Sequence, residues 1–253
     1  MSIPIVKNKT GLSTWQAESL RVTCFPSSAT ELNTANWWQD VIGEQPENTV
    51  VRARDGFRQD EGTVNSRKVV LGIQPNRIDW LMRPNEEGGE LTIGSFQDSL
   101  DSFLELMSRW FKISPSLRRL AFGVVLALPV DNRKSGYELI ANFLPNVKLD
   151  PIGSSDFLYQ INRTRNSQLS ISELEINRLS KWSVAKQGLA RIDLLPEARV
   201  SLFPSSDTFS SRLELDINTS ADYKDDLPMN KIAGVFLELV DLAKEIALKG
   251  DIP

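Results

Sequence analysis

The side chains that could do chemistry in this chain are carboxylates, arginines and lysines, because its 253 residues include no histidine. This excludes Ser-His-Asp and Cys-His catalysis and any metal site that needs a histidine ligand. The sequence has no G-x-x-x-x-G-K-[ST] or G-x-G-x-x-G phosphate loop and no G-x-S-x-G elbow. We therefore expect no cofactor and a protein that is not an enzyme.

Acidic residues gather before the last predicted helix. The segments LELD (213–216) and ADYKDD (221–226) bring together Glu214, Asp216, Asp222, Asp225 and Asp226. Such a cluster could bind Mg²⁺ or Ca²⁺ through oxygen ligands, and a metal-dependent hydrolase built on Glu214 and Asp216 is one hypothesis. The alternative is that the last two aspartates favour the positive N-terminus of the following helix. No E-x-K motif occurs, so a carboxylate-and-lysine nuclease site is not indicated.

Basic residues form the second pattern with chemical potential. If the strands that carry them are neighbours, their solvated face would be a basic surface, which could hold a phosphate backbone or an acidic protein partner. The alternative is an ordinary solvated face with charges of both signs. The residues predicted for this surface are Arg163, Arg165, Arg178, Lys181, Arg118 and Arg119.

Two adjacent tryptophans, Trp37 and Trp38, lie in a predicted helix. Neighbouring positions on a helix cannot both face one core, so we expect one indole at an edge or an interface, where tryptophan is enriched. The alternative is that this indole covers the sheet of the first half.

These residues depend on elements that hydrophobic periodicity predicts. Alternation with period two predicts strands, and apolar positions three and four apart predict helices. The expected strands cover residues 19–25, 50–54, 67–73, 77–83, 117–130, 156–163, 169–184, 190–203 and 212–217. The expected helices cover about 30–43, 95–111, 135–145 and 228–250.

The order of elements reads β-α-β-β-β-α, followed by β-α-β-β-β-β-α. We predict an α+β fold with two antiparallel sheet halves, helices packed on one face, and an approximate duplication of β-α-β-β-β-α. The predicted halves are 1–113 and 117–253, with Lys112–Ser116 as the only candidate hinge. Because no linker rich in Pro, Gly or Ser separates them, they could also form one continuous domain.

Composition narrows the partners and the compartment. A net charge of −4 and a pI near 5.1 argue against a nucleic-acid binder that uses its whole surface. The N-terminus has no secretory apolar region, and the longest near-apolar run, Leu120–Val130, is too short to span a bilayer. Cys24 is the single cysteine, and its apolar strand predicts a packed core thiol. We expect a cytoplasmic protein with no membrane partner.

The second half resembles a bacterial family of similar length that is sporadically distributed and mostly uncharacterised. The resemblance rests on LRRLAFGVVLALPV, the short helix ending in FLP, the strand LELDINT and the helix IAGVFLELVDLAKEIALKGD. It covers about 117–251, with Arg118 or Arg119 and Leu215-Asp216-Ile217 at the places of the family's motifs. The two sheet-plus-helix halves also look like the fold of SecB-type export chaperones, by analogy only.

Two main hypotheses follow. The first is a non-catalytic interaction or adaptor subunit of a bacterial multi-protein system, and the patchy distribution of the resembling family suggests antiviral defence or a toxin-linked operon. The second is a nucleic-acid-binding accessory subunit that uses the basic sheet face. A protein partner is expected under the first hypothesis, and a homo-oligomer remains open.

Overall fold

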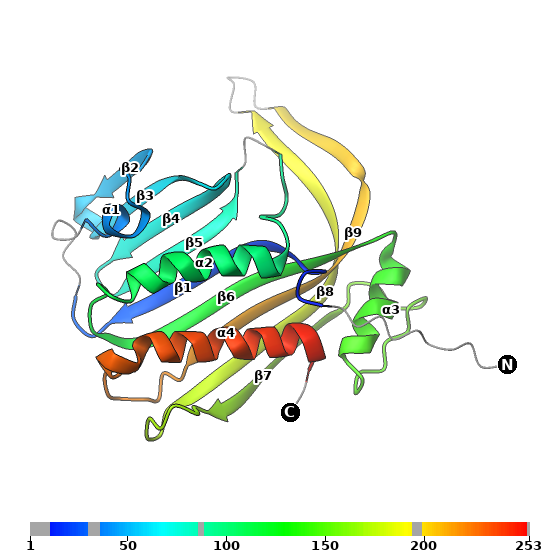
Figure 1. Ribbon diagram of the computed structural model, residues 1–253. Coiled ribbons are helices and arrows are strands. Elements are labelled where there is room, and N and C mark those ends of the chain that lie inside the picture. The colour runs from blue at the N-terminus through cyan, green and yellow to red at the C-terminus, as the bar shows by residue number, and fades with distance from the viewer. Residues whose placement is uncertain (1–10, 30–35, 86–88, 194–198, 252–253) are drawn as a thin grey trace.

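The alternating segments pair into one antiparallel sheet of nine strands, in the order β2-β3-β4-β5-β1-β6-β9-β8-β7 (Figure 1). The structure is a computed structural model that describes residues 11–29, 36–85, 89–193 and 199–251, with the backbone alone for 187–193 and 199–208. The fold class is α+β, as the alternation of strand and helix patterns predicts.

The strands and helices have these bounds. The strands are β1 (Gln16–Pro26), β2 (Asn48–Arg52), β3 (Phe57–Val64), β4 (Arg67–Gln74), β5 (Arg77–Pro84), β6 (Leu117–Val130), β7 (Leu158–Asn166), β8 (Glu175–Asp193) and β9 (Arg199–Thr219). The helices are α1 (Trp37–Ile42), α2 (Phe96–Trp110), α3 (Arg133–Phe143) and α4 (Ile232–Lys249), with short 3₁₀ turns at Ala53–Asp55 and Met229–Lys231.

The two halves repeat one arrangement around the centre of the sheet. β1 and β6, the first strand of each half, pair antiparallel with one another. Each is flanked by the last strand of its own half, β5 or β9, and the earlier strands continue outward in reverse order. α2 and α4 close the halves and lie side by side over the same face (Figure 1). The approximate duplication predicted from the element order is therefore present within one continuous sheet.

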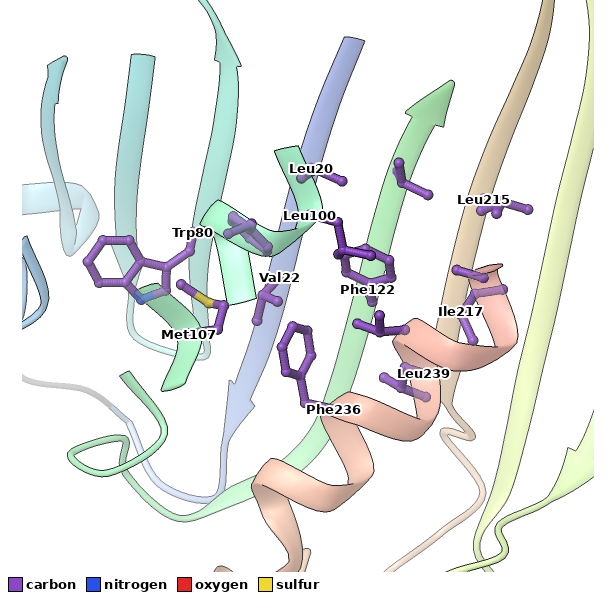
Figure 2. Packing of buried hydrophobic residues seen from close by; sticks show 14 of the residues in the cluster. Leu20, Val22, Trp80, Leu100, Met107, Phe122, Leu215, Ile217, Phe236 and Leu239 are labelled. Carbon is purple, nitrogen blue, oxygen red and sulfur yellow. The ribbon is translucent and has the colours of Figure 1, made fainter. Parts of the chain in front are cut away.

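The apolar sides of the central strands and of both long helices form the core. Figure 2 shows the side chains of α2 and α4 directed at the inner faces of β1, β5, β6 and β9. Phe122 lies at its centre, with its ring 5.9 Å from Phe236 of α4 and 6.5 Å from Phe103 of α2. Phe111 and Phe236, whose rings are 5.0 Å apart, join the two helices. Cys24 is also buried here, as predicted, and burial raises the pKa of its thiol to about 12.

The predicted and observed strands differ in three places. β3 was not predicted, because the sequence FRQDEGTV alternates too weakly in polarity to stand out. Residues 169–174, expected to begin a strand, instead form the connection from β7 to β8. The sequence predicts an extended segment over 190–203 with an interruption at Pro196, which lies outside the described residues. The residues on its two sides, 190–193 and 199–203, do not form a separate strand but extend β8 and β9.

The far ends of β8 and β9 project beyond the rest of the sheet. β6 pairs with β9 only as far as Val130 opposite Phe209. Beyond this point β8 and β9 continue to pair with each other alone, out to Asp193 opposite Arg199. The two strands therefore extend past the sheet as a two-stranded arm, which Figure 1 shows rising beyond the helices.

Candidate functional site: the open face of the sheet

The face opposite α2 and α4 carries a hollow of about 390 Å³. Its lining comes from six adjacent strands, β5, β1, β6, β9, β8 and β7. The register aligns one residue from each strand across its floor, because antiparallel partners share a face. This row reads Leu81, Arg21, Gly123, Asp216 and Leu179, and it continues beyond the lining to Asn162 of β7.

Gly123 has no side chain, so the surface of the sheet is recessed at the middle of this row. A Cβ built on Gly123 would lie 3.5 Å from both Nε and Nη2 of Arg21, so the Arg21 guanidinium lies over the glycine. β6 is otherwise rich in bulky apolar residues, and a glycine inside a strand often marks close approach by another group. Gly123 thus gives the guanidinium a place at the centre of the open face.

The Arg21 guanidinium is available for a ligand. Among the described residues, no side chain forms a hydrogen bond or an ion pair with it. Arg21 is half-buried, so a carboxylate or another acceptor at this position would meet a partly desolvated cation. The adjacent Asp216 accepts a hydrogen bond from Nδ2 of Asn218, at 3.0 Å.

One side of the hollow carries a chain of ion pairs. Glu214 accepts from Lys181 Nζ at 3.1 Å and from Arg212 Nη1 at 2.7 Å. Arg212 Nη2 also forms an ion pair with Glu18 Oε2, at 3.0 Å. Two cations and two carboxylates thus hold one another in place across β8 and β9 and beside β1.

The other side carries neutral amides and a second ion pair. Asn162 donates to Asn177, and Asn177 donates to Asn218, over 2.9 and 3.1 Å. Across the sheet, Asp79 accepts from Arg77 Nε and from the Thr23 hydroxyl, both at 2.6 Å. The hydrogen bonds to Asp79 raise the pKa of Arg77 above its usual value.

The charges around the hollow are of both signs. Arg83 lies on the open side of β5, two residues beyond Leu81. This part of the face is therefore mixed in sign. The other charged groups are the cations Arg21, Arg77, Lys181 and Arg212 and the carboxylates Glu18, Asp79, Glu214 and Asp216.

The predicted basic surface is not a single face. Arg163, Arg165 and Arg178 lie on the helix-covered side of β7 and β8, whereas Lys181 lies on the open side. Grouping them on one solvated face was therefore wrong. The alternation of side chains along each strand indicates this arrangement. On β7, Arg163 and Arg165 lie on the same face as Ile161. On β8, Arg178 lies on the same face as the buried Ile176 and Trp182.

Two of these arginines are bound by carboxylates at the end of α4. Asp251 accepts from Arg163 Nε at 2.6 Å and Nη2 at 2.8 Å, and from the Tyr159 hydroxyl at 2.8 Å. The Arg163 hydrogen bonds hold the pKa of Asp251 below its usual value. Arg165 Nη1 forms an ion pair with Glu245 Oε2, at 3.3 Å. These contacts fasten β7 to the C-terminus of α4.

Arg178 is 3% exposed, and its Nε and Nη1 have no hydrogen-bond partner among the described residues. Burial lowers the pKa of its guanidinium, and the neighbouring charges of Arg165 and Arg163 add to the effect. It is enclosed between the sheet and α4 and is therefore inaccessible to a macromolecular partner.

The remaining predicted basic residues lie at the start of β6. Arg118 is exposed. Arg119 lies over the Phe25 ring, 5.0 Å from its centre, and donates to the carbonyl oxygen of Thr219. Neither lines the hollow, so the six predicted residues occupy three separate places.

Both adjacent tryptophans pack inward. Trp38 stacks on Trp80 with ring centres 6.2 Å apart, and Trp37 meets Trp110 edge-on at 5.1 Å. Trp38 is buried and Trp37 half-buried. Because α1 lies at the margin of the sheet, its two adjacent tryptophans can pack against different elements, Trp37 against α2 and Trp38 against β5. Coverage of the first-half sheet is the role that the structure gives them.

The predicted acidic cluster is dispersed. Glu214 and Asp216 lie on the open face, whereas Asp222, Asp225 and Asp226 are exposed in the connection before α4. In the part of the chain that the structure describes, no three His, Cys, Asp or Glu side chains are placed to share a metal ion.

Sequence reasoning missed Arg21 and Gly123, the central residues of the hollow. The only signal for Gly123 was a glycine inside the otherwise apolar run LAFGVVLALPV. Arg21 alternates with buried residues, but its unpaired state depends on the strands placed beside β1.

The chain was compared with protein-family models, with curated proteins and with solved structures, and none of them matches it. The resemblance to the bacterial family therefore stays a prediction. Within the described residues, no helix combines the length and the apolar character needed to cross a membrane.

Proposed function

We propose that this protein is a non-catalytic interaction subunit that binds a protein partner in the hollow on the open face of its sheet. The observation that carries the proposal is the half-buried Arg21 guanidinium over Gly123, which has no partner among the described residues. Antiparallel sheets can keep one face solvated, but a hollow with an unpaired cation at its centre favours a ligand.

The chemistry of the hollow favours protein over nucleic acid. Leu81, Val125 and Leu179 offer apolar contact beside the polar groups. The charges of both signs supply complementarity for a mixed peptide surface, and the carboxylates among them oppose a phosphate backbone. An acidic side chain or a terminal carboxylate of the partner would pair with Arg21.

The test uses two glycines on the same face. Gly123→Val fills the hollow and displaces the Arg21 guanidinium, while Gly72→Val adds the same side chain on β4, outside the lining. Proteins that co-purify with the wild type from its native host are identified, and their affinity for all three purified proteins is then measured. We expect Gly123→Val to weaken binding at least about tenfold and Gly72→Val to leave it unchanged.

A second measurement addresses the nucleic-acid alternative. Single-stranded and duplex DNA and RNA are titrated at low and high salt, because phosphate binding falls steeply with salt. Salt-dependent nucleic-acid binding that Gly123→Val leaves intact, together with no partner sensitive to that change, would overturn the proposal.

A further inference from the structure

α4 exposes a stripe of residues with the spacing of a coiled-coil seam. Its outward positions, three and four residues apart in alternation, are Gly234, Leu237, Asp241, Lys244 and Leu248. Leu237 is 49% and Leu248 44% exposed, on a helix whose other leucines lie in the core. The repeat of three and four residues is the one with which helices pack side by side.

The corresponding face of α2 has a different composition. Its exposed positions are polar and include Asp98, Asp101, Glu105 and Arg109. α2 and α4 cover the same face of the sheet side by side, so their different outer surfaces do not follow from the fold (Figure 1). The leucines on α4 therefore need a separate explanation.

A groove of about 650 Å³ runs along this stripe. α4 forms one wall, and Leu169 and Gln168 of the β7–β8 connection form the other. Leu169 approaches the Gly234 position, where a Cβ would lie 3.4 Å from its Cδ1. The groove gives a helix laid along α4 a second apolar contact.

The stripe is complementary to itself when reversed. A two-fold axis that crosses α4 between Leu242 and Ala243 places Leu237 opposite Leu248 of the second copy. The same axis places Asp241 opposite Lys244 of the second copy, so the dimer would contain two such pairs of opposite charge. Asp241 has 72% of its side chain exposed and lies only 3.0 Å from Lys244 of its own helix, so both groups can exchange partners. A symmetric dimer requires this kind of self-complementary surface.

We infer that the α4 stripe is the interface of a homodimer in which two α4 helices pack antiparallel. Two leucine pairs at the ends and two acid–base pairs at the centre fix the register, because a slip by one turn would place an acid or a base against leucine. This surface is separate from the open-face hollow, so dimerisation and partner binding can be tested independently.

The experiment measures the oligomeric state of the full chain by analytical ultracentrifugation over a range of concentrations. The wild type should dimerise reversibly. Asp241→Lys places a like charge opposite Lys244 of the other copy, at two positions in the dimer, and the dimer dissociation constant should rise at least about tenfold. The double change Asp241→Lys with Lys244→Asp restores opposite charges and should restore the dimer.

Controls separate the interface from general effects. Asp101→Lys makes the same charge reversal on α2 and should leave the dimer unchanged, and circular dichroism checks that each variant is folded. Gly123→Val should dimerise like the wild type even where it loses its partner. A monomeric wild type, a dimer insensitive to Asp241→Lys, or no recovery in the folded double variant would each overturn the inference.

Discussion

The two faces of the sheet use neighbouring residues of one strand for opposite purposes. On β6, Phe122 is fully buried under α2 and α4, and the next residue, Gly123, forms the floor of the open hollow. Around Phe122 the covered face is filled by large apolar side chains, whereas on the open face Gly123 contributes no side chain and the Arg21 guanidinium lies over it. We therefore expect the covered face, which buries large apolar side chains, to contribute more to stability than the open face.

The largest expected effect comes from the covered face. Phe122→Ala removes the ring that contacts both long helices, and it should lower the free energy of unfolding by about 3 to 5 kcal/mol. Chemical denaturation measures the loss. Val125→Ala, three positions along on the open side, is the matched control and should cost about 1 kcal/mol or less. Equal losses would mean that the two faces do not differ in this way.

The next effect concerns the ion pair that joins β7 to α4. Asp251→Asn keeps the shape of the side chain but leaves Arg163 without its anion, and it should lower the free energy of unfolding by about 2 kcal/mol. The Asp251 side chain is only 6% exposed, which makes this pair stronger than one on the surface. If Asp251→Asn lowered the free energy of unfolding no more than the loss of an ion pair on the open face, the two faces would not differ in this respect.

The same carboxyl predicts a dependence on pH. The pKa of Asp251 is lower in the folded protein than in the unfolded chain, chiefly because of the Arg163 hydrogen bonds. The folded state therefore binds fewer protons, and the contribution is present above the unfolded pKa, about 4, and is lost as pH falls through the folded value. The stability difference between wild type and Asp251→Asn should shrink in that acid range. A constant difference down to pH 2 would contradict it.

The smallest expected effect lies on the open face. Lys181→Ala removes one ion pair, but Glu214 keeps Arg212 as a partner. Both side chains are about one-third exposed, so the free energy of unfolding should change by less than about 1 kcal/mol. Thermal unfolding at low and high salt measures this. A loss above about 2 kcal/mol would show that the open face is part of the stabilising structure.

Particular residues show how far the sequence alone leads. The helices predicted over 95–111 and 228–250 from their apolar periodicity are present as α2 and α4, and each buries an apolar face. The predicted ranges 30–43 and 228–250 end at Gly43 and Gly250, which cap α1 and α4. These predictions hold because helix periodicity and end signals are local. An interruption of 190–203 at Pro196 was also predicted, but not that its two sides would extend the strands before and after it, since the pairing of β8 with β9 is a long-range choice.

The candidate site was less predictable than the fold. The basic residues were recognised, but three of them were assigned to the wrong face, and Arg21 was overlooked. Whether an arginine is free depends on which carboxylates approach it from other strands and helices. Asp251 reaches Arg163 from the end of a helix 88 residues away in the sequence.

The sequence by itself determined the α+β class, the approximate repetition of a strand, a helix, several strands and a helix, the amphipathic faces of the long helices, and the lack of any histidine-dependent chemistry. These follow from composition and from periodicity within one segment. The number of strands in each half was not predicted correctly, because β3 was missed and 190–203 is not a separate strand. Only the tertiary structure decided that the two halves share one sheet, that Arg21 lies unpaired over Gly123, and that Arg163 and Arg165 are bound by carboxylates. Strand order and register bring distant residues together, and no local pattern specifies which strand will lie beside which.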